Sequence, residues 1–143
     1  MNREPANLAI PRVPSFLSPA LKSPDAPHEL VIDRTGTVLV RMVELAVDSA
    51  SRKKGLLGRD GLAEGAGLVI APTNAVHTFF MRFPIDIIFL TRAGSVAKIR
   101  TGVVPRRVAG ALRGFAVLEM AAGSADRAGL RVGDTVTLRP IQS

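Results

Sequence analysis

The segment from Val76 to Asp86 holds the residues whose types and spacing could do chemistry. His77, one of the chain's 2 histidines, stands there with Arg82 and Asp86 in an otherwise apolar run. Charged groups in apolar surroundings are costly unless they are paired or used. If the chain forms a hairpin that turns at residues 81–84, His77 lies opposite Asp86, and the carboxylate can hold the imidazole in one tautomer. Arg82 would then add a positive charge at the turn.

The same pattern also has a structural interpretation. His77 and Asp86 could satisfy each other in a buried network, or Asp86 could anchor the turn by accepting backbone amide hydrogens. If the segment crosses between sheets instead of forming a hairpin, the pairing fails. We therefore keep three interpretations of the motif open, namely structure, ligand binding and catalysis.

Two further charged residues stand close to apolar segments. Arg59 follows a predicted helix, and its guanidinium could clamp a carboxylate or phosphate, or form a structural ion pair with Glu119 or Asp86. Glu119 shares one face of a predicted apolar strand with Val117, where a carboxylate is either at the rim or paired. The candidate ligand-binding residues are therefore Arg59, His77, Phe80, Arg82, Asp86 and Glu119.

Several kinds of site are missing from the sequence. The chain has no cysteine, which excludes disulfides and thiolate metal sites. It has no phosphate-cradling glycine-rich loop, no Gly-x-Ser-x-Gly nucleophile elbow and no His-Glu-x-x-His helix. His77 with Asp86 and Glu119 could form at most a weak metal site, and the many arginines argue against it. We therefore expect no cofactor and no bound metal, and we lean towards a protein that is not an enzyme.

The chain divides into an arm and a domain. Six prolines fall within residues 1–28, and proline disfavours both helix and sheet because it lacks an amide donor. We predict a flexible, proline-rich arm there and a single β domain over residues 29–143. Turn signals separate short aliphatic runs, which predicts strands at 29–33, 37–47, 67–71, 75–80, 85–91, 96–104, 115–120 and 135–139, with helices at 49–57 and 124–130. The predicted fold class is mainly β, an antiparallel sandwich or partly closed barrel with one or two short helices.

The charge balance bears on partners and compartment. A formal net charge of +7 could indicate nucleic acid or an anionic membrane as a partner. The charges are scattered, however, and no aromatic residues interleave with the basic runs 52–54 and 106–107, so a nucleic-acid partner is not expected. No apolar run of about 18 residues occurs, so no transmembrane segment is predicted. The sequence as written predicts a cytoplasmic protein, and export with a signal peptide removed beforehand stays an alternative.

Three motifs resemble the bacterial and archaeal family known as domain of unknown function 192. They are the segments 52–59, 77–89 and 117–134, and the central one is the most specific. The resemblance implies a compact, mainly β sandwich of the jelly-roll type and no established activity, so no catalytic residue can be carried over. Where many members have tryptophan this chain has Phe80, and where many have asparagine it has Phe83, so a polar turn in those relatives is partly apolar here.

The leading functional interpretation is a binding domain that is not an enzyme. Its ligand would be a small polar or anionic molecule, or a segment of a partner protein, held near the His77–Asp86 motif, with Phe80 and its aromatic neighbours as an apolar wall. One alternative is an enzyme in which His77 acts as a general base that Asp86 orients. Another is a basic protein that binds nucleic acid through charge.

Overall fold

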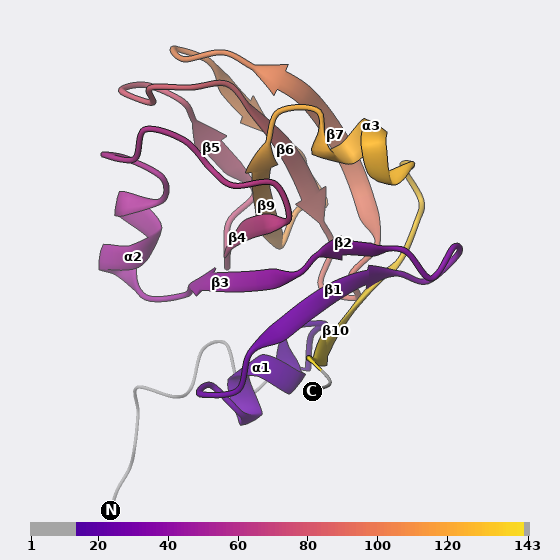
Figure 1. The fold of residues 1–143 in the computed structure, drawn as a ribbon. Coiled ribbons are helices and arrows are strands. Elements are labelled where there is room, and N and C mark those ends of the chain that lie inside the picture. Colours follow the sequence, from indigo (N-terminus) through magenta and orange to yellow (C-terminus); the bar gives the residue numbers. More distant parts are fainter. Residues whose placement is uncertain (1–13, 142–143) are drawn as a thin grey trace, which may run out of the picture.

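The computed structural model describes residues 14–141, which form ten strands and three short helices (Figure 1). Two antiparallel neighbours flank β1 in a three-stranded sheet with the order β10-β1-β2. A five-stranded sheet has the order β3-β4-β9-β6-β7, and a small two-stranded sheet pairs β5 with β8. The first two sheets contain β1 (His28–Ile32), β2 (Val38–Val40), β10 (Val136–Pro140), β3 (Met42–Ala46), β4 (Ala66–Ile70), β9 (Ala116–Ala121), β6 (Ile85–Leu90) and β7 (Val96–Val103). The third contains β5 (Ala75–His77) and β8 (Val108–Gly110).

The predicted mainly β fold is confirmed, and the sheets do not close into a barrel. Neighbouring strands of the five-stranded sheet are antiparallel except β3 and β4, which are parallel. All six residues of β6 are buried, because this strand lies inside the sheet and both of its faces are covered. Such a strand reads in sequence as a continuous apolar run, and Asp86 is its one charged residue.

Two apolar clusters lie on opposite faces of the five-stranded sheet. Leu118 and Met120 of β9 point into the cluster shared with the three-stranded sheet. Val117 points into the second cluster, together with Ile87 and Phe89 of β6. Because side chains alternate along a strand, Glu119 lies on the same face of β9 as Val117. The β pleat therefore directs this carboxylate towards the second cluster.

The predicted strand 37–47 is two strands in different sheets. Arg41 is where the chain passes from β2 in the three-stranded sheet to β3 in the five-stranded sheet, and its amide donates to the Gly65 carbonyl at 2.8 Å. The polar residues Arg41 and Glu44 are three positions apart, which breaks the alternation of a single strand. This break reflects the passage between sheets. A local sequence pattern cannot distinguish such a passage from a bulge in one long strand.

The prediction of a flexible arm needs correction over residues 14–28. Helix α1 (Ser18–Lys22) forms there, and Leu17 and Ala20 are buried in the cluster between the two larger sheets. Pro19 is compatible with this helix because it stands in the first turn, where its missing amide would have no helical partner. His28, expected in the arm, is a buried residue at the start of β1. The prediction for residues 1–13 lies outside the described residues.

The two predicted helices begin at the predicted residues and end earlier than predicted. Helix α2 (Ser49–Lys54) begins after Asp48, whose side chain accepts from the Ser51 amide at 2.8 Å, as expected of an N-cap. It ends at Lys54, with Gly55 as the C-cap, whereas the predicted helix extends to residue 57. Helix α3 (Ser124–Ala128) follows β9 directly. None of the helices within residues 14–141 is long and apolar enough to cross a membrane.

Gly67 of β4 stands where the two larger sheets approach each other. A Cβ atom at this position would lie 2.9 Å from Leu118 Cδ1 and 2.9 Å from Val40 Cγ2. We expect Gly67→Ala to lower the free energy of unfolding by about 1–3 kcal/mol, because the added methyl group overpacks the core. Urea denaturation followed by circular dichroism measures the change, and Gly61→Ala, with open space around it, is the control. Equal stability of the two variants would contradict the expected overpacking.

Candidate functional site

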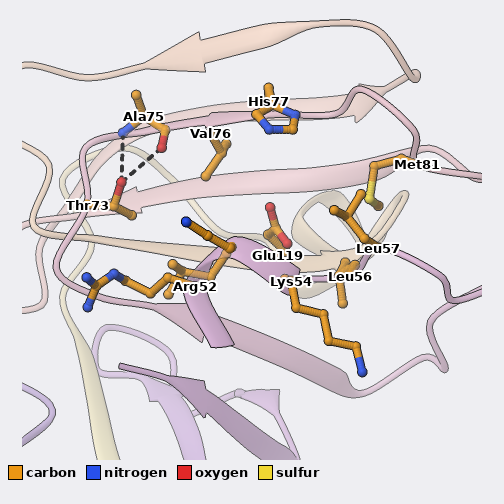
Figure 2. A pocket seen from close by; sticks show the side chains of 13 residues that line it. Arg52, Lys54, Leu56, Leu57, Thr73, Ala75, Val76, His77, Met81 and Glu119 are labelled. Atoms are coloured by element: carbon orange, nitrogen blue, oxygen red, sulfur yellow. Dashed lines mark hydrogen bonds between the residues drawn. The ribbon is translucent and has the colours of Figure 1, made fainter. Parts of the chain in front are cut away.

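A pocket of about 230 Å³ opens between α2, β5 and the face of the five-stranded sheet that carries Glu119 (Figure 2). We call it the Glu119 pocket. It is lined by residues 52–57, Ile70, Thr73, residues 75–77, Met81 and Glu119. The pocket therefore combines the end of a helix, one strand of the small sheet and the middle of the central sheet.

Glu119 forms the polar part of the pocket floor. It lies in register with Leu68 of β4 and Ile87 of β6, and only 4% of its surface is exposed. Its carboxylate points into the space between β5 and α2 (Figure 2). No hydrogen bond joins the Glu119 carboxylate to any residue within 14–141. The sequence predicted a carboxylate that is at the rim or paired, and the structure shows one that is buried in a pocket without such a bond.

The surroundings of Glu119 shift its protonation. Burial raises the pKa of Glu119 to about 7, and the positive charge of Arg59 acts in the opposite direction with a smaller effect. The walls around the carboxyl group include the apolar side chains of Leu56, Ile70 and Met81. Near neutral pH both protonation states are populated, so this group can accept a hydrogen bond in one state and donate one in the other.

Arg59 acts on the pocket from outside its walls. Its guanidinium donates to both carboxylate oxygens of Glu44, with distances of 2.9 and 3.0 Å. This ion pair lowers the pKa of Glu44 and raises the pKa of Arg59. The expected structural ion pair of Arg59 is therefore present, but its partner is Glu44 instead of Glu119 or Asp86. Because Arg59 is held in this way, it contributes a fixed positive charge near Glu119.

Helix α2 supplies the basic edge of the pocket. Arg52 donates to the Val47 carbonyl at 2.8 Å, and Lys53 and Lys54 are exposed. In Figure 2 the Arg52 and Lys54 side chains extend away from the Glu119 carboxylate, so their charges surround the mouth and not the floor. At Gly55 the helix ends with φ 47, and a Cβ there would be 3.9 Å from Glu119 Oε1. The basic run 52–54 was visible in the sequence, but nothing in the sequence placed it beside Glu119.

Strand β5 forms the opposite wall. His77 lines the pocket and is otherwise exposed, and its ring lies 5.7 Å from that of Phe79 between centroids. Thr73 makes a tight turn before the strand, because its hydroxyl donates to the Ala75 carbonyl at 2.9 Å (Figure 2). His77 and Glu119 therefore line the same pocket.

The predicted pairing of His77 with Asp86 is wrong. His77 lies opposite Val108 in the two-stranded sheet, whereas Asp86 lies opposite Met120 in the five-stranded sheet. Residues 78–84 carry the chain from one sheet to the other and do not form a hairpin turn. This is the sheet crossing under which the pairing was expected to fail, and it removes Asp86 as an orienting partner for a His77 general base.

Asp86 has a structural role instead. It is 0% exposed, and its carboxylate accepts backbone amide hydrogens from Gly102 at 2.9 Å, Gly123 at 3.2 Å and Ala125 at 2.9 Å. Among the open interpretations, the one in which Asp86 accepts backbone amides is the arrangement found. The amides come from the end of β7 and the start of α3, not from the turn next to Asp86.

Arg82 and Phe80 lie outside the pocket. Arg82 donates to Asp60 at 2.6 Å, and both side chains are exposed. Phe80 is 83% exposed and therefore gives the pocket no apolar wall. Of the six candidate residues, only His77 and Glu119 line the pocket, while Arg59 acts on it through its charge. Within residues 14–141, no group of three or more His, Cys, Asp or Glu side chains is placed to hold a metal ion.

Comparison with known proteins agrees with this architecture. Residues 30–138 match the family of domain of unknown function 192, DUF192, which is described as uncharacterized ACR. The chain belongs to the DUF192 family. No match was found among curated proteins. The motifs that suggested the family lie at the end of α2 and just after it, from the end of β5 through most of β6, and from β9 to the turn after α3.

Two crystal structures are similar to this DUF192 chain. One is a protein of unknown function from Novosphingobium aromaticivorans, with 31% identity, a TM-score of 0.67, and coverage of 77% of this chain and 82% of that one. The other, from Sinorhizobium meliloti, is described as a "putative transcription regulator"; it has 25% identity, a TM-score of 0.68, and coverage of 78% of this chain and 91% of that one. Both support the fold, and neither has an assigned ligand in its description.

Proposed function

We propose that this DUF192 chain is a ligand-binding domain whose site is the Glu119 pocket. The ligand is a small molecule that donates a hydrogen bond to Glu119 and carries an anionic group at the basic mouth. One observation supports the proposal above the others. Glu119 is a buried carboxyl group that faces a pocket and has no hydrogen-bond partner among the described residues.

The state of Glu119 supports a donor on the ligand. Burial disfavours the ionised form of a carboxyl group, and a donor that enters the pocket and bonds to Glu119 would offset that cost. A hydrogen bond to a charged group contributes about 1.5–3 kcal/mol, which is roughly a factor of ten to a hundred in affinity. A hydroxyl or ammonium group on the ligand would supply that bond, because each donates to a carboxylate.

The rest of the pocket supports a short molecule with an acidic group. A volume of about 230 Å³ equals roughly eight water molecules at liquid density, which is below the range of drug-sized sites. Leu56, Val76 and Met81 offer apolar contact in the interior. The charges of Lys53 and Lys54 near the mouth favour an anionic group there. Short hydroxy acids and amino acids combine these features.

The test is an amide-resolved NMR titration of the full chain with a panel of short hydroxy acids, amino acids and amino alcohols. We expect saturable shifts at Gly55, Val76 and Glu119 with the acids, and weaker binding of the amino alcohols, which lack the anionic group. Glu119→Gln should weaken the binding of the acids by about tenfold or more, because glutamine accepts a weaker hydrogen bond than a carboxylate. Glu64→Gln, at an exposed ion pair with Arg127, is the control and should not change the affinity.

Two results would contradict the proposal. One is an affinity for every member of the panel that is the same in Glu119→Gln and in the natural chain. The other is the absence of saturable shifts around the pocket with any acid. The description of the Sinorhizobium relative suggests nucleic acid as the competing ligand. Titration with a short oligonucleotide is therefore part of the panel, and shifts confined to surface arginines would favour that function over the pocket.

A further inference from the structure

Four apolar side chains project from two neighbouring loops at one edge of the molecule. Phe79 and Phe80 lie between β5 and β6. Val104 follows the end of β7, and Val108 is the first residue of β8. All four are exposed, with 83% of Phe80 and 65% of Val108 accessible. We call residues 78–84 and 104–108 the paired tips, and they lie in the upper left of Figure 1. Contiguous exposed apolar side chains are unusual in a soluble protein unless they contact something.

Thr78 holds the two tips together. It is buried, its amide donates to the Arg107 carbonyl at 2.8 Å, and its carbonyl accepts from the Met81 and Arg106 amides at 3.1 and 3.2 Å. Its hydroxyl donates to the Val104 carbonyl at 2.8 Å and accepts from the Arg107 amide at 2.8 Å. The apolar side chains are therefore displayed from a hydrogen-bonded platform that joins both loops.

Each tip contains one residue with a strained backbone conformation. Phe80 has φ 67 and Arg106 has φ 71, and these are the non-glycine residues with positive φ within residues 14–141. A bulky residue rarely adopts this conformation, because its Cβ meets the backbone. Strain of this kind points to function when the strained side chain makes no stabilising packing contacts. Phe80 is such a case, since its ring is almost fully exposed.

The paired tips carry three arginines, and one of them, Arg82, is paired with the exposed Asp60 from outside the tips. Between residues 65 and 118 the chain has six arginines and one lysine, and its single acidic residue is Asp86. Asp86 is fully buried and engaged by backbone amides, so no acidic side chain in this stretch reaches the surface. Arg106 and Arg107 stand beside the exposed valines and take part in no ion pair within residues 14–141. Arg106 and Arg107, together with the exposed apolar side chains, therefore favour a partner that accepts apolar groups and carries negative charge.

We infer that the paired tips dock on an anionic lipid surface. Phe79, Phe80, Val104 and Val108 would enter the boundary between headgroups and acyl chains, while Arg106 and Arg107 would contact the headgroups. Peripheral binding of this kind scales with buried apolar area and with attraction to anionic lipids. A single-stranded nucleic acid is favoured less, because it requires a series of aromatic platforms, and valine offers no π-face for a base. This inference does not depend on the Glu119 pocket.

The first test is co-sedimentation of the full chain with vesicles. We expect binding to phosphatidylcholine vesicles that contain about a quarter phosphatidylglycerol, and little binding to phosphatidylcholine alone. Phe79→Ser combined with Phe80→Gly should weaken the binding by about tenfold or more. Arg106→Gln combined with Arg107→Gln should weaken it by roughly twenty-five-fold, about fivefold for each arginine.

Matched controls remove the same features elsewhere. Met42→Ser combined with Val132→Ser removes two exposed apolar side chains from β3 and from the turn before β10. Lys22→Gln combined with Arg131→Gln removes two positive charges at α1 and after α3, at other edges of the fold in Figure 1. Both controls should keep full vesicle binding. Glycine accepts the positive φ at position 80, so Phe80→Gly should not lower the melting temperature.

A second test reports insertion directly. The chain has no tryptophan and no tyrosine, so Phe80→Trp introduces a single fluorophore at the tip. Its emission should shift to the blue with anionic vesicles and be quenched by brominated acyl chains. Val132→Trp should show neither change.

Three outcomes would overturn the inference. The first is equal binding to neutral and anionic vesicles, and the second is the absence of vesicle binding at low salt. The third is a Phe80→Trp variant that sediments with the vesicles although its tryptophan emission does not change. Binding of a short oligothymidine without binding of vesicles would also overturn it, in favour of nucleic acid. A loss of stability in Phe80→Gly with unchanged vesicle binding would show that the ring is structural.

Discussion

Replacing Asp86 with alanine is expected to lower the free energy of unfolding by about 3–5 kcal/mol, because three backbone amides lose a charged acceptor. Ala125 is buried, so its amide in particular cannot turn to water for a substitute. Asp86→Asn should cost less, since one oxygen remains to accept. Urea denaturation followed by circular dichroism gives both values.

The control for this prediction is an exposed carboxylate that accepts no backbone amide hydrogens from residues 14–141. Asp60 is exposed and pairs only with the exposed Arg82, so Asp60→Ala should change stability by less than about 1 kcal/mol. If Asp86→Ala and Asp60→Ala were equally mild, the amide network of Asp86 would not hold β6 to β7 and α3. If the network does hold them, hydrogen exchange at Ala125 should accelerate in Asp86→Ala before the molecule unfolds globally.

The central motif shows which inferences from the sequence depend on local chemistry and which do not. A charged residue inside an apolar run had to be satisfied, and Asp86 is satisfied by backbone amides. Which groups satisfy it could not be predicted, because Gly102, Gly123 and Ala125 are brought to it by strand pairings of long sequence separation. The predicted hairpin failed for the same reason. His77 pairs with Val108 on a strand that follows β6 and β7 in the chain, and a local turn signal carries no information about such a partner.

Glu119 shows what strand periodicity can supply. The alternation of β9 placed its carboxylate on the face of Val117, and the structure confirms that face. Whether that face met solvent or other residues depended on α2 and β5, which come from distant segments. The residues that complete the pocket, such as Thr73 and Met81, have no chemical signature of their own. The sequence could therefore indicate one side of the site but not its walls.

The exposed side chains of the paired tips were the feature that the sequence predicted least well. The sequence predicted Phe80 as an apolar wall of the site, because positive φ at a phenylalanine has no sequence signal. Arg106 and Arg107 come from a neighbouring loop, which a local pattern does not indicate. The prediction of a flexible arm was wrong over residues 14–28 for a related reason. Proline counts describe a tendency against regular structure, yet burial of Leu17 offsets that tendency in the native fold.

The stability of the protein is expected to fall by about 3 kcal/mol as the pH rises from 4.5 to beyond 7, through the ionisation of Glu119 alone. The pKa of this carboxyl is about 7 in the folded chain and 4.5 in the reference state. In this window the folded state binds more protons than the unfolded state, so each rise in pH favours unfolding. Below pH 4.5 both states are protonated at Glu119, and the penalty is absent.

Glu119→Gln removes the titrating group and should remove this contribution. Relative to the natural chain, the variant should gain about 3 kcal/mol between pH 4.5 and pH 8. Glu64→Gln, at an exposed position, should follow the natural chain at every pH. Urea denaturation across the pH range measures all three proteins, and parallel curves for the natural chain and Glu119→Gln would contradict the raised pKa. An anionic ligand that donates to Glu119 would flatten the same slope, because it stabilises the ionised carboxylate in the folded state. The pH dependence of stability with and without a short hydroxy acid therefore connects the charge of the pocket to its occupant.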